Sequence, residues 1–178
     1  MTKLRKLMVA SLCVALTISG CASALKPSPS LAETKSPTQL LRNNAASYFS
    51  DISDAGPVVV DHSDACLSSN DDPDGLVRRW VSSVDLTLVA TVTESLDELP
   101  NRVLGPYLAN DWIVAYEAAR EIGLTNQKFE SMLKITPSGG VDGTGAGSHI
   151  VIIALGPCVD TGGAESDEVK QLESFATG

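Results

Sequence analysis

Residues 76–88, Leu-Val-Arg-Arg-Trp-Val-Ser-Ser-Val-Asp-Leu-Thr-Leu, follow the alternation of a β-strand. Trp80 and Val84 belong to a parity that is largely apolar, whereas Arg79 and Asp85 belong to a parity that is mostly polar. Successive side chains of a strand point to opposite faces of a sheet. The pattern therefore predicts a strand with one buried face and one mostly solvated face.

Further strand signals lie on both sides of this segment. Apolar or alternating residues predict strands at 112–116, 128–136 and 149–155. The last of these stops before Pro157, because proline cannot continue the ladder of hydrogen bonds. Earlier in the chain, residues 58–60 are three valines, which indicate either a short strand or an extended connection.

Two segments have the spacing of amphipathic helices. Ser36 followed by Pro37 is typical of a helix start and predicts a helix from Pro37 to Ile52. A second apolar stripe predicts a helix over 96–110, with prolines that favour a start at Pro100 and a kinked end. The order β-α-β-β-β predicts an α+β domain with a four-stranded, mainly antiparallel sheet, one helix packed on a face and an additional N-terminal helix.

Length and charge limit the classes of function. The chain has 178 residues, 43% of them hydrophobic, which fits one globular domain with additional flexible sequence. It carries 13 Lys and Arg against 22 Asp and Glu, a net charge of −9. An acidic surface repels phosphate, so we expect no nucleic acid partner. No motif requires a cofactor.

The N-terminus has the plan of an export signal. Three basic residues precede an apolar run at 7–18, and small residues follow it. The run is shorter than the ~20 residues that a spanning helix needs. We therefore expect a removed signal at 1–20, a flexible tether at 21–35, a folded domain at 36–160 and an acidic tail at 161–178. The tail is expected to be partly disordered or to form a short helix.

The segment Ile18-Ser19-Gly20-Cys21 resembles the lipobox of bacterial lipoproteins. The resemblance implies that Cys21 is acylated and becomes the first residue of the mature chain, which is then anchored at the outer face of the cytoplasmic membrane. Two or three acyl chains give stable anchoring, whereas one chain binds only marginally. The alternative is secretion, because Ala22-Ser23-Ala24 forms a competing cleavage site.

Two cysteines remain after the signal and the anchor are set aside. Cys66 and Cys158 most simply form one disulfide in an exported chain. A catalytic thiol is the other interpretation, but no motif supplies a histidine partner. A zinc site has too few Cys and His residues at suitable spacing.

Oxygen-bearing residues before the strand at 76–88 provide a weak candidate for a metal site. Asn70, Asp72 and Asp74 match the first half of a calcium loop. Position 12 of that register is Val81, where a bidentate Glu is required. A turn rich in Asp, Pro and Gly is therefore the simpler interpretation.

Two other segments contain residue types found in catalytic or binding motifs. The run from Asp61 to Asp64 contains His62 and Ser63, but such a local run does not assemble a catalytic triad from separate elements. The glycines at 139–147 precede a strand and lack the Lys-Ser/Thr pair of a phosphate loop, so they predict a hairpin loop.

Over its whole length the chain resembles small uncharacterised lipoproteins of high-GC Gram-positive bacteria. The lipobox, the run 72–80 and residues 156–159 carry this resemblance, which implies no catalytic residue. We expect a non-enzymatic binding or accessory module, with an envelope protein, a wall polymer or a small ligand as partner. The alternatives are an envelope hydrolase that uses carboxylates and a calcium-dependent adhesion domain.

Overall fold

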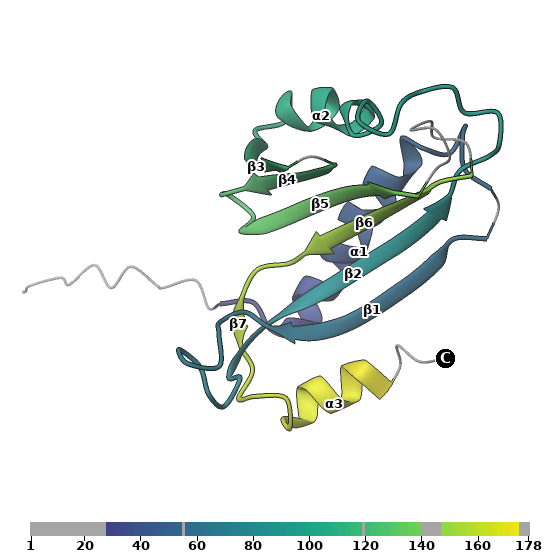
Figure 1. Cartoon of the computed structure of the whole chain (residues 1–178). Coiled ribbons are helices and arrows are strands. Elements are labelled where there is room, and N and C mark those ends of the chain that lie inside the picture. The colour runs from purple at the N-terminus through teal and green to yellow at the C-terminus, as the bar shows by residue number, and fades with distance from the viewer. Residues whose placement is uncertain (1–27, 55, 119, 140–146, 175–178) are drawn as a thin grey trace, which may run out of the picture.

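The computed structural model describes residues 28–54, 56–118, 120–139 and 147–174. In chain order its elements are α1 (Leu31–Ser47), β1 (Val58–Ala65), β2 (Val77–Thr87), α2 (Asn101–Leu108), β3 (Ile113–Ala118), β4 (Glu121–Asn126), β5 (Ser131–Ser138), β6 (His149–Leu155), β7 (Val159–Asp160) and α3 (Asp167–Ser174). The strands form one antiparallel sheet in the order β1-β2-β6-β5-β4-β3, and β7 pairs with β2 (Figure 1).

The α+β class with an antiparallel sheet is confirmed, but the predicted four strands are wrong. Within the described residues the sheet has seven strands, because 58–60 opens a full strand, β4 adds another and the short β7 pairs with β2. β4 lacks a regular alternation, since Gly123 interrupts it and the Tyr116 ring occupies the space beside that glycine. β5 starts at Ser131 rather than 128, because Glu130 has a positive φ of 49° in the preceding turn.

The first helix begins and ends earlier than predicted. Ser30 is its N-cap and forms a capping box with Glu33, so the helix starts at Leu31 and not at Pro37. Pro37 lies inside the helix, which ends at Ser47 rather than at Ile52. Residues 31–35, which we assigned to the flexible tether, are therefore helical.

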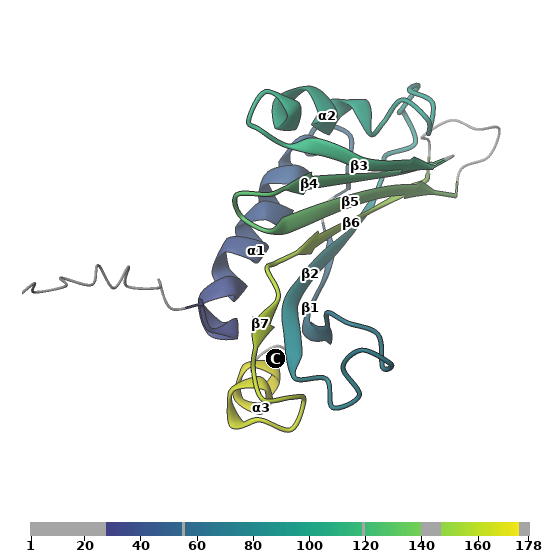
Figure 2. The same ribbon diagram turned by 90° about the vertical axis from the view of Figure 1, so that its left-hand side faces the viewer.

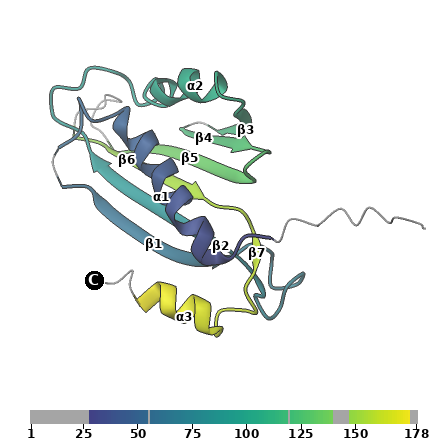
Figure 3. The ribbon, with the colours of Figure 1, turned by 180° about the vertical axis from the view of Figure 1, so that it is seen from behind.

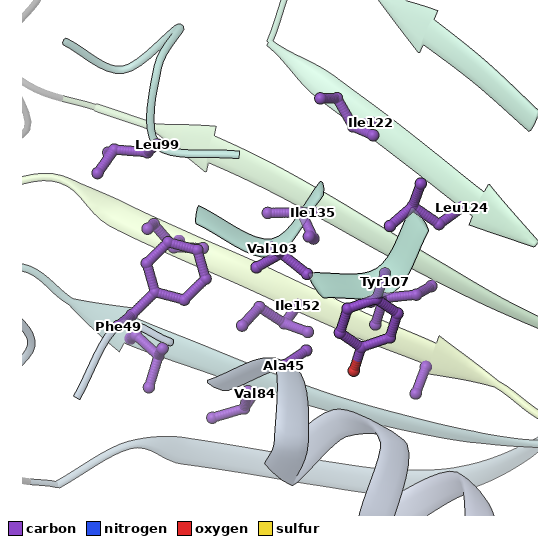
Figure 4. Packing of buried hydrophobic residues seen from close by; sticks show 14 of the residues in the cluster. Ala45, Phe49, Val84, Leu99, Val103, Tyr107, Ile122, Leu124, Ile135 and Ile152 are labelled. Atoms are coloured by element: carbon purple, nitrogen blue, oxygen red, sulfur yellow. The ribbon is translucent and has the colours of Figure 1, made fainter. Parts of the chain in front are cut away.

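Both α1 and α2 cover one face of the sheet (Figure 2). Apolar residues of the predicted buried parity of β2, including Val84, meet Ala45 of α1, Phe49 in the turn after it and Val103 of α2 there (Figure 4). The predicted stripe of 96–110 is confirmed as a buried face, and α2 begins after Pro100. The opposite face of the sheet is not covered by any of the helices described.

A second, smaller core joins the two ends of the folded chain. Trp80 is fully buried and packs with Leu31, Val159 and Val169. α3 lies beside α1 and the end of β1 (Figure 1), where Glu168 accepts a hydrogen bond from the backbone of Ala32. The predicted disulfide between Cys66 and Cys158 is present and spans 92 residues. The acidic tail therefore contains an ordered helix, which was one of the two expectations for it.

None of the helices among the described residues is long and apolar enough to span a bilayer. The predicted signal and Cys21 lie outside the described residues.

Candidate functional site

A groove runs along one side of α1, between the helix and the end of the sheet that carries the β4–β5 turn. Its volume is about 620 Å³. We call it the α1 groove; it is lined by Pro29, Glu33, Thr34, Pro37, Thr38, Leu40, Leu41, Asn44, Trp112, Phe129, Ser131 and Pro157. The residues come from α1 and the residue before its N-cap, from the start of β3, from the β4–β5 turn and from the chain after β6. The fold and not one motif therefore forms the site.

Aromatic rings and prolines give the α1 groove its chemical character. Trp112 is nearly buried in its wall, whereas Phe129 is 58% exposed at its rim. The Trp112 ring meets Tyr107 edge-on at 5.1 Å, and Tyr107 in turn meets Tyr48 at 6.3 Å. Such edge contacts hold rings in fixed orientations. The wall is therefore a preformed aromatic surface.

A smaller cavity of about 300 Å³ continues the α1 groove toward α2. Leu41, Asn44 and Trp112 line both spaces, and Asn110 adds a second amide in the smaller one. A side-chain amide has two donor hydrogens and an acceptor oxygen, and Asn110 uses one of its donors on the Pro106 carbonyl at 2.8 Å. The combined site is elongated, apolar along its walls and supplied with neutral hydrogen-bonding groups.

The polar residues under the groove are used by the helix itself. The hydroxyls of Thr34 and Thr38 donate to the carbonyls of Leu31 and Thr34 at 2.8 and 2.7 Å. Glu33 accepts a hydrogen bond from the backbone of Ser30 in the capping box. Among the described residues that line the α1 groove, Glu33 is the only charged one, and no cation lines it.

The other side of α1 is closed by a buried ion pair. Arg42 contacts Asp61 of β1 at 3.4 Å, and the two side chains are 8% and 14% exposed. Gln39 and the Trp80 indole also donate to this carboxylate. Partial burial acts to raise the pKa of Asp61, but the neighbouring Ser82 hydroxyl, Gln39, Arg42 and Trp80 outweigh it and lower that pKa.

The run from Asp61 to Asp64 forms no catalytic arrangement. Asp61 and Ser63 lie on the helix-covered face of β1, whereas His62 lies on the opposite face, as the pairing with β2 requires. Ser63 donates to Glu173 and accepts from Arg78. The side chains that a nucleophilic mechanism needs are thus separated by the strand or engaged elsewhere.

The proposed calcium ligands are arranged as a turn. Both carboxylate oxygens of Asp72 accept backbone hydrogen bonds, from Leu76 at 2.9 Å and Val77 at 2.8 Å. These bonds lower the pKa of Asp72, with the bond from Val77 contributing most. Asn70 and Asp74 are exposed beside it. Within the ranges that the structure describes, no three His, Cys, Asp or Glu residues gather closely enough to hold a metal ion.

One histidine meets a carboxylate on the uncovered face of the sheet. His149 Nδ1 lies 3.1 Å from an oxygen of Asp85, and both side chains are nearly half exposed. Neither residue lines the α1 groove or its continuation. Of the glycine-rich segment 139–147, residues 140–146 lie outside the described part of the chain.

Sequence reasoning identified the disulfide and the burial of Trp80 but missed the α1 groove. The helical spacing of 37–52 and the alternation of 128–136 count Leu40 and Phe129 among the apolar positions of those elements, whereas both residues are exposed in the structure. The only available signal was the density of proline and aromatic residues in segments whose adjacency the sequence does not reveal.

Comparison with family models, with curated proteins and with solved structures found no match for this chain. The geometry of the described residues is therefore the basis for a functional proposal.

Proposed function

We propose that this protein is a non-enzymatic binding module of the cell envelope, anchored through a lipid on Cys21, that holds its ligand in the α1 groove. The observation that carries the binding role is the groove beside α1, which has the nearly buried Trp112 in its wall and the exposed Phe129 and Leu40 at its border. A monomeric protein rarely leaves a contiguous apolar patch exposed without a binding role.

The shape and chemistry of the α1 groove favour an extended peptide segment that contains proline. α1 is 17 residues long, so the groove follows a helix of about 25 Å. Aromatic-lined grooves recognise polyproline II segments, because these are already extended and lose little entropy on binding. Asn44 and Asn110 offer donors to the free carbonyls of such a segment.

Charge argues against an anionic ligand. Among the described residues that line the α1 groove none is a cation, and the whole chain has a net charge of −9. One lysine, Lys128, lies at the rim, with its Nζ atom 5.4 Å from the centre of the Phe129 ring. A neutral or basic segment meets no such repulsion. An envelope protein with an exposed proline-containing segment is therefore the partner class that we favour over an anionic wall polymer.

The peptide-binding role is tested with a synthetic peptide of about ten prolines as probe. We expect saturable binding to the purified protein by calorimetry. Phe129→Ala and Leu40→Ala are each expected to weaken the Kd about 5- to 10-fold, equivalent to about 1 to 1.4 kcal/mol.

Leu108→Ala is the matched control, because Leu108 is similarly exposed but lies on α2 outside the α1 groove. Equal affinities for all three variants and the parent protein, or no binding by the parent, would contradict the role of the groove.

The anchor is tested separately by intact mass of the protein from its native membrane fraction. A chain that begins at Cys21 with two or three acyl chains supports the anchor. An unacylated chain that begins near Leu25 would indicate secretion instead and would leave the groove proposal standing.

A further inference from the structure

The two edge strands of the sheet, β1 and β3, differ in how they are protected. An edge strand presents unpaired backbone N–H and C=O groups that invite another strand. β3 carries an irregular register between Val114 and Tyr116, and a bulge of this kind twists an edge away from further pairing. β1 pairs with β2 in an unbroken register from Val58 to Ala65.

In the C-terminal half of β1, side chains form hydrogen bonds with backbone groups at the exposed edge. The Cys66 N–H donates to Val77 of β2, so odd-numbered residues of β1 direct their backbone groups away from the sheet. The outward N–H of Ser63 donates to Glu173 at 3.2 Å, and the Ser63 carbonyl accepts from Arg78 at 3.1 Å. The outward N–H of Ala65 donates to Asp64 at 2.9 Å.

The other half of the edge is open. Among the described residues, no hydrogen-bond partner meets the outward backbone groups of Val59 and Asp61. The side chains of Val58, Val59 and Val60 are 64%, 46% and 50% exposed. Pro57 lacks an N–H and limits pairing at one end, while the sealed Ser63 limits it at the other. The open segment is therefore 57–61, with Val59 at its centre.

We infer that a second copy of this chain adds to the sheet at residues 57–61, antiparallel, with a two-fold axis at Val59. Val59 then exchanges both backbone hydrogen bonds with the partner's Val59, and the Asp61 N–H donates to the partner's Pro57. Val58 packs opposite the partner's Val60. The same patch serves both subunits, as a two-fold interface requires.

The open segment avoids the charge repulsion that two copies of this chain would meet elsewhere. Two chains of net charge −9 repel over most of their surfaces. The one charged residue of the open segment, Asp61, is neutralised by Arg42 within its own chain. The pairing places valine against valine and no carboxylate against another. The contact is small, so the dimer is expected to be weak and concentration-dependent.

Sedimentation equilibrium of the full chain over a range of concentrations tests the dimer. We expect a monomer–dimer equilibrium for the parent protein. Val59→Lys is expected to abolish it without changing the melting temperature, because like charges directly opposite each other repel across paired strands. Val114→Lys on β3 is the matched control, since Val114 is 44% exposed, and it should dimerise like the parent.

The axis is tested by Val59→Cys under mild oxidation. Opposed residues in a hydrogen-bonded antiparallel pair have Cα atoms about 5.5 Å apart, within the range that a disulfide bridges. We expect a covalent dimer that neither the parent nor Val114→Cys forms. A parent protein that stays monomeric at its highest soluble concentration, or a Val59→Lys variant that dimerises unchanged, would overturn the inference.

Discussion

The two long sides of α1 meet the rest of the molecule in different ways (Figure 3). On the side of β1, Arg42 and Gln39 converge on Asp61 and close the space with satisfied polar groups. On the other side, Leu40 and Phe129 border an open groove. The difference indicates that one side anchors the helix while the other is left available for a ligand.

The largest expected effect concerns neither side of α1 but the disulfide that joins the end of β1 to the start of β7. Replacing Cys66 and Cys158 by Ser is expected to lower the free energy of unfolding by about 2 to 5 kcal/mol, because the bond closes a loop of 92 residues. Urea unfolding measures this change. The same stability with and without the bond would contradict a stabilising role of this cross-link.

The second largest loss of stability is expected when the ion pair between Arg42 and Asp61 is broken. Arg42→Ala leaves the Asp61 carboxylate without its cation in a largely buried place, so we expect a loss of about 3 kcal/mol. Leu40→Ala is the control from the opposite side of the same helix and should change stability by less than about 0.5 kcal/mol. Similar losses for the two variants in thermal melts would remove the distinction between the sides.

The close approach of α1 to the sheet gives a third prediction. A Cβ at Gly156 would lie 2.5 Å from Thr38 Oγ1, and the Thr38 side chain is buried. Gly156→Ala is therefore expected to cost about 1 to 3 kcal/mol by overpacking. Adding Thr38→Ala removes the clash and should recover part of this loss. An additive loss in the double variant would show that the glycine serves another purpose.

The smallest effect concerns pH. The pKa of Asp61 is lowered in the folded protein, so the folded state favours the charged carboxylate. Its contribution is complete above the unfolded pKa of about 3.9 and is lost as the pH falls through the lower folded value. We expect stability to fall with pH in this acid range, and to fall less steeply in Asp61→Asn. Parallel pH curves for the two proteins would contradict this assignment.

The sequence predicts some elements of the fold more accurately than others. Strand 76–88 and the helix after Pro100 had strong periodic patterns, and two remaining cysteines left one simple pairing. The predicted start of α1 is wrong because Ser36-Pro37 has the residue types of an N-cap and a first helical position, although both residues lie inside the helix. The true capping box at Ser30 lies in a stretch whose small residues and prolines are typical of a linker.

The candidate site could not be predicted in the same way. Trp112 and Phe129 both lie beside α1 because β4 pairs between β3 and β5. The sequence of β4 has no regular alternation from which this strand could be predicted. A groove built from separate elements depends on tertiary adjacency, which local patterns do not carry.

The most direct test of the central claim uses the two tryptophans of the chain as reporters. Trp112 lines the α1 groove, whereas Trp80 is fully buried on the closed side of α1. In ¹H–¹⁵N spectra recorded during titration with the proline peptide, the Trp112 indole signal is predicted to shift in a saturable way while the Trp80 signal stays in place. A stationary Trp112 signal, or a shift confined to Trp80, would contradict the assignment of the α1 groove as the binding site.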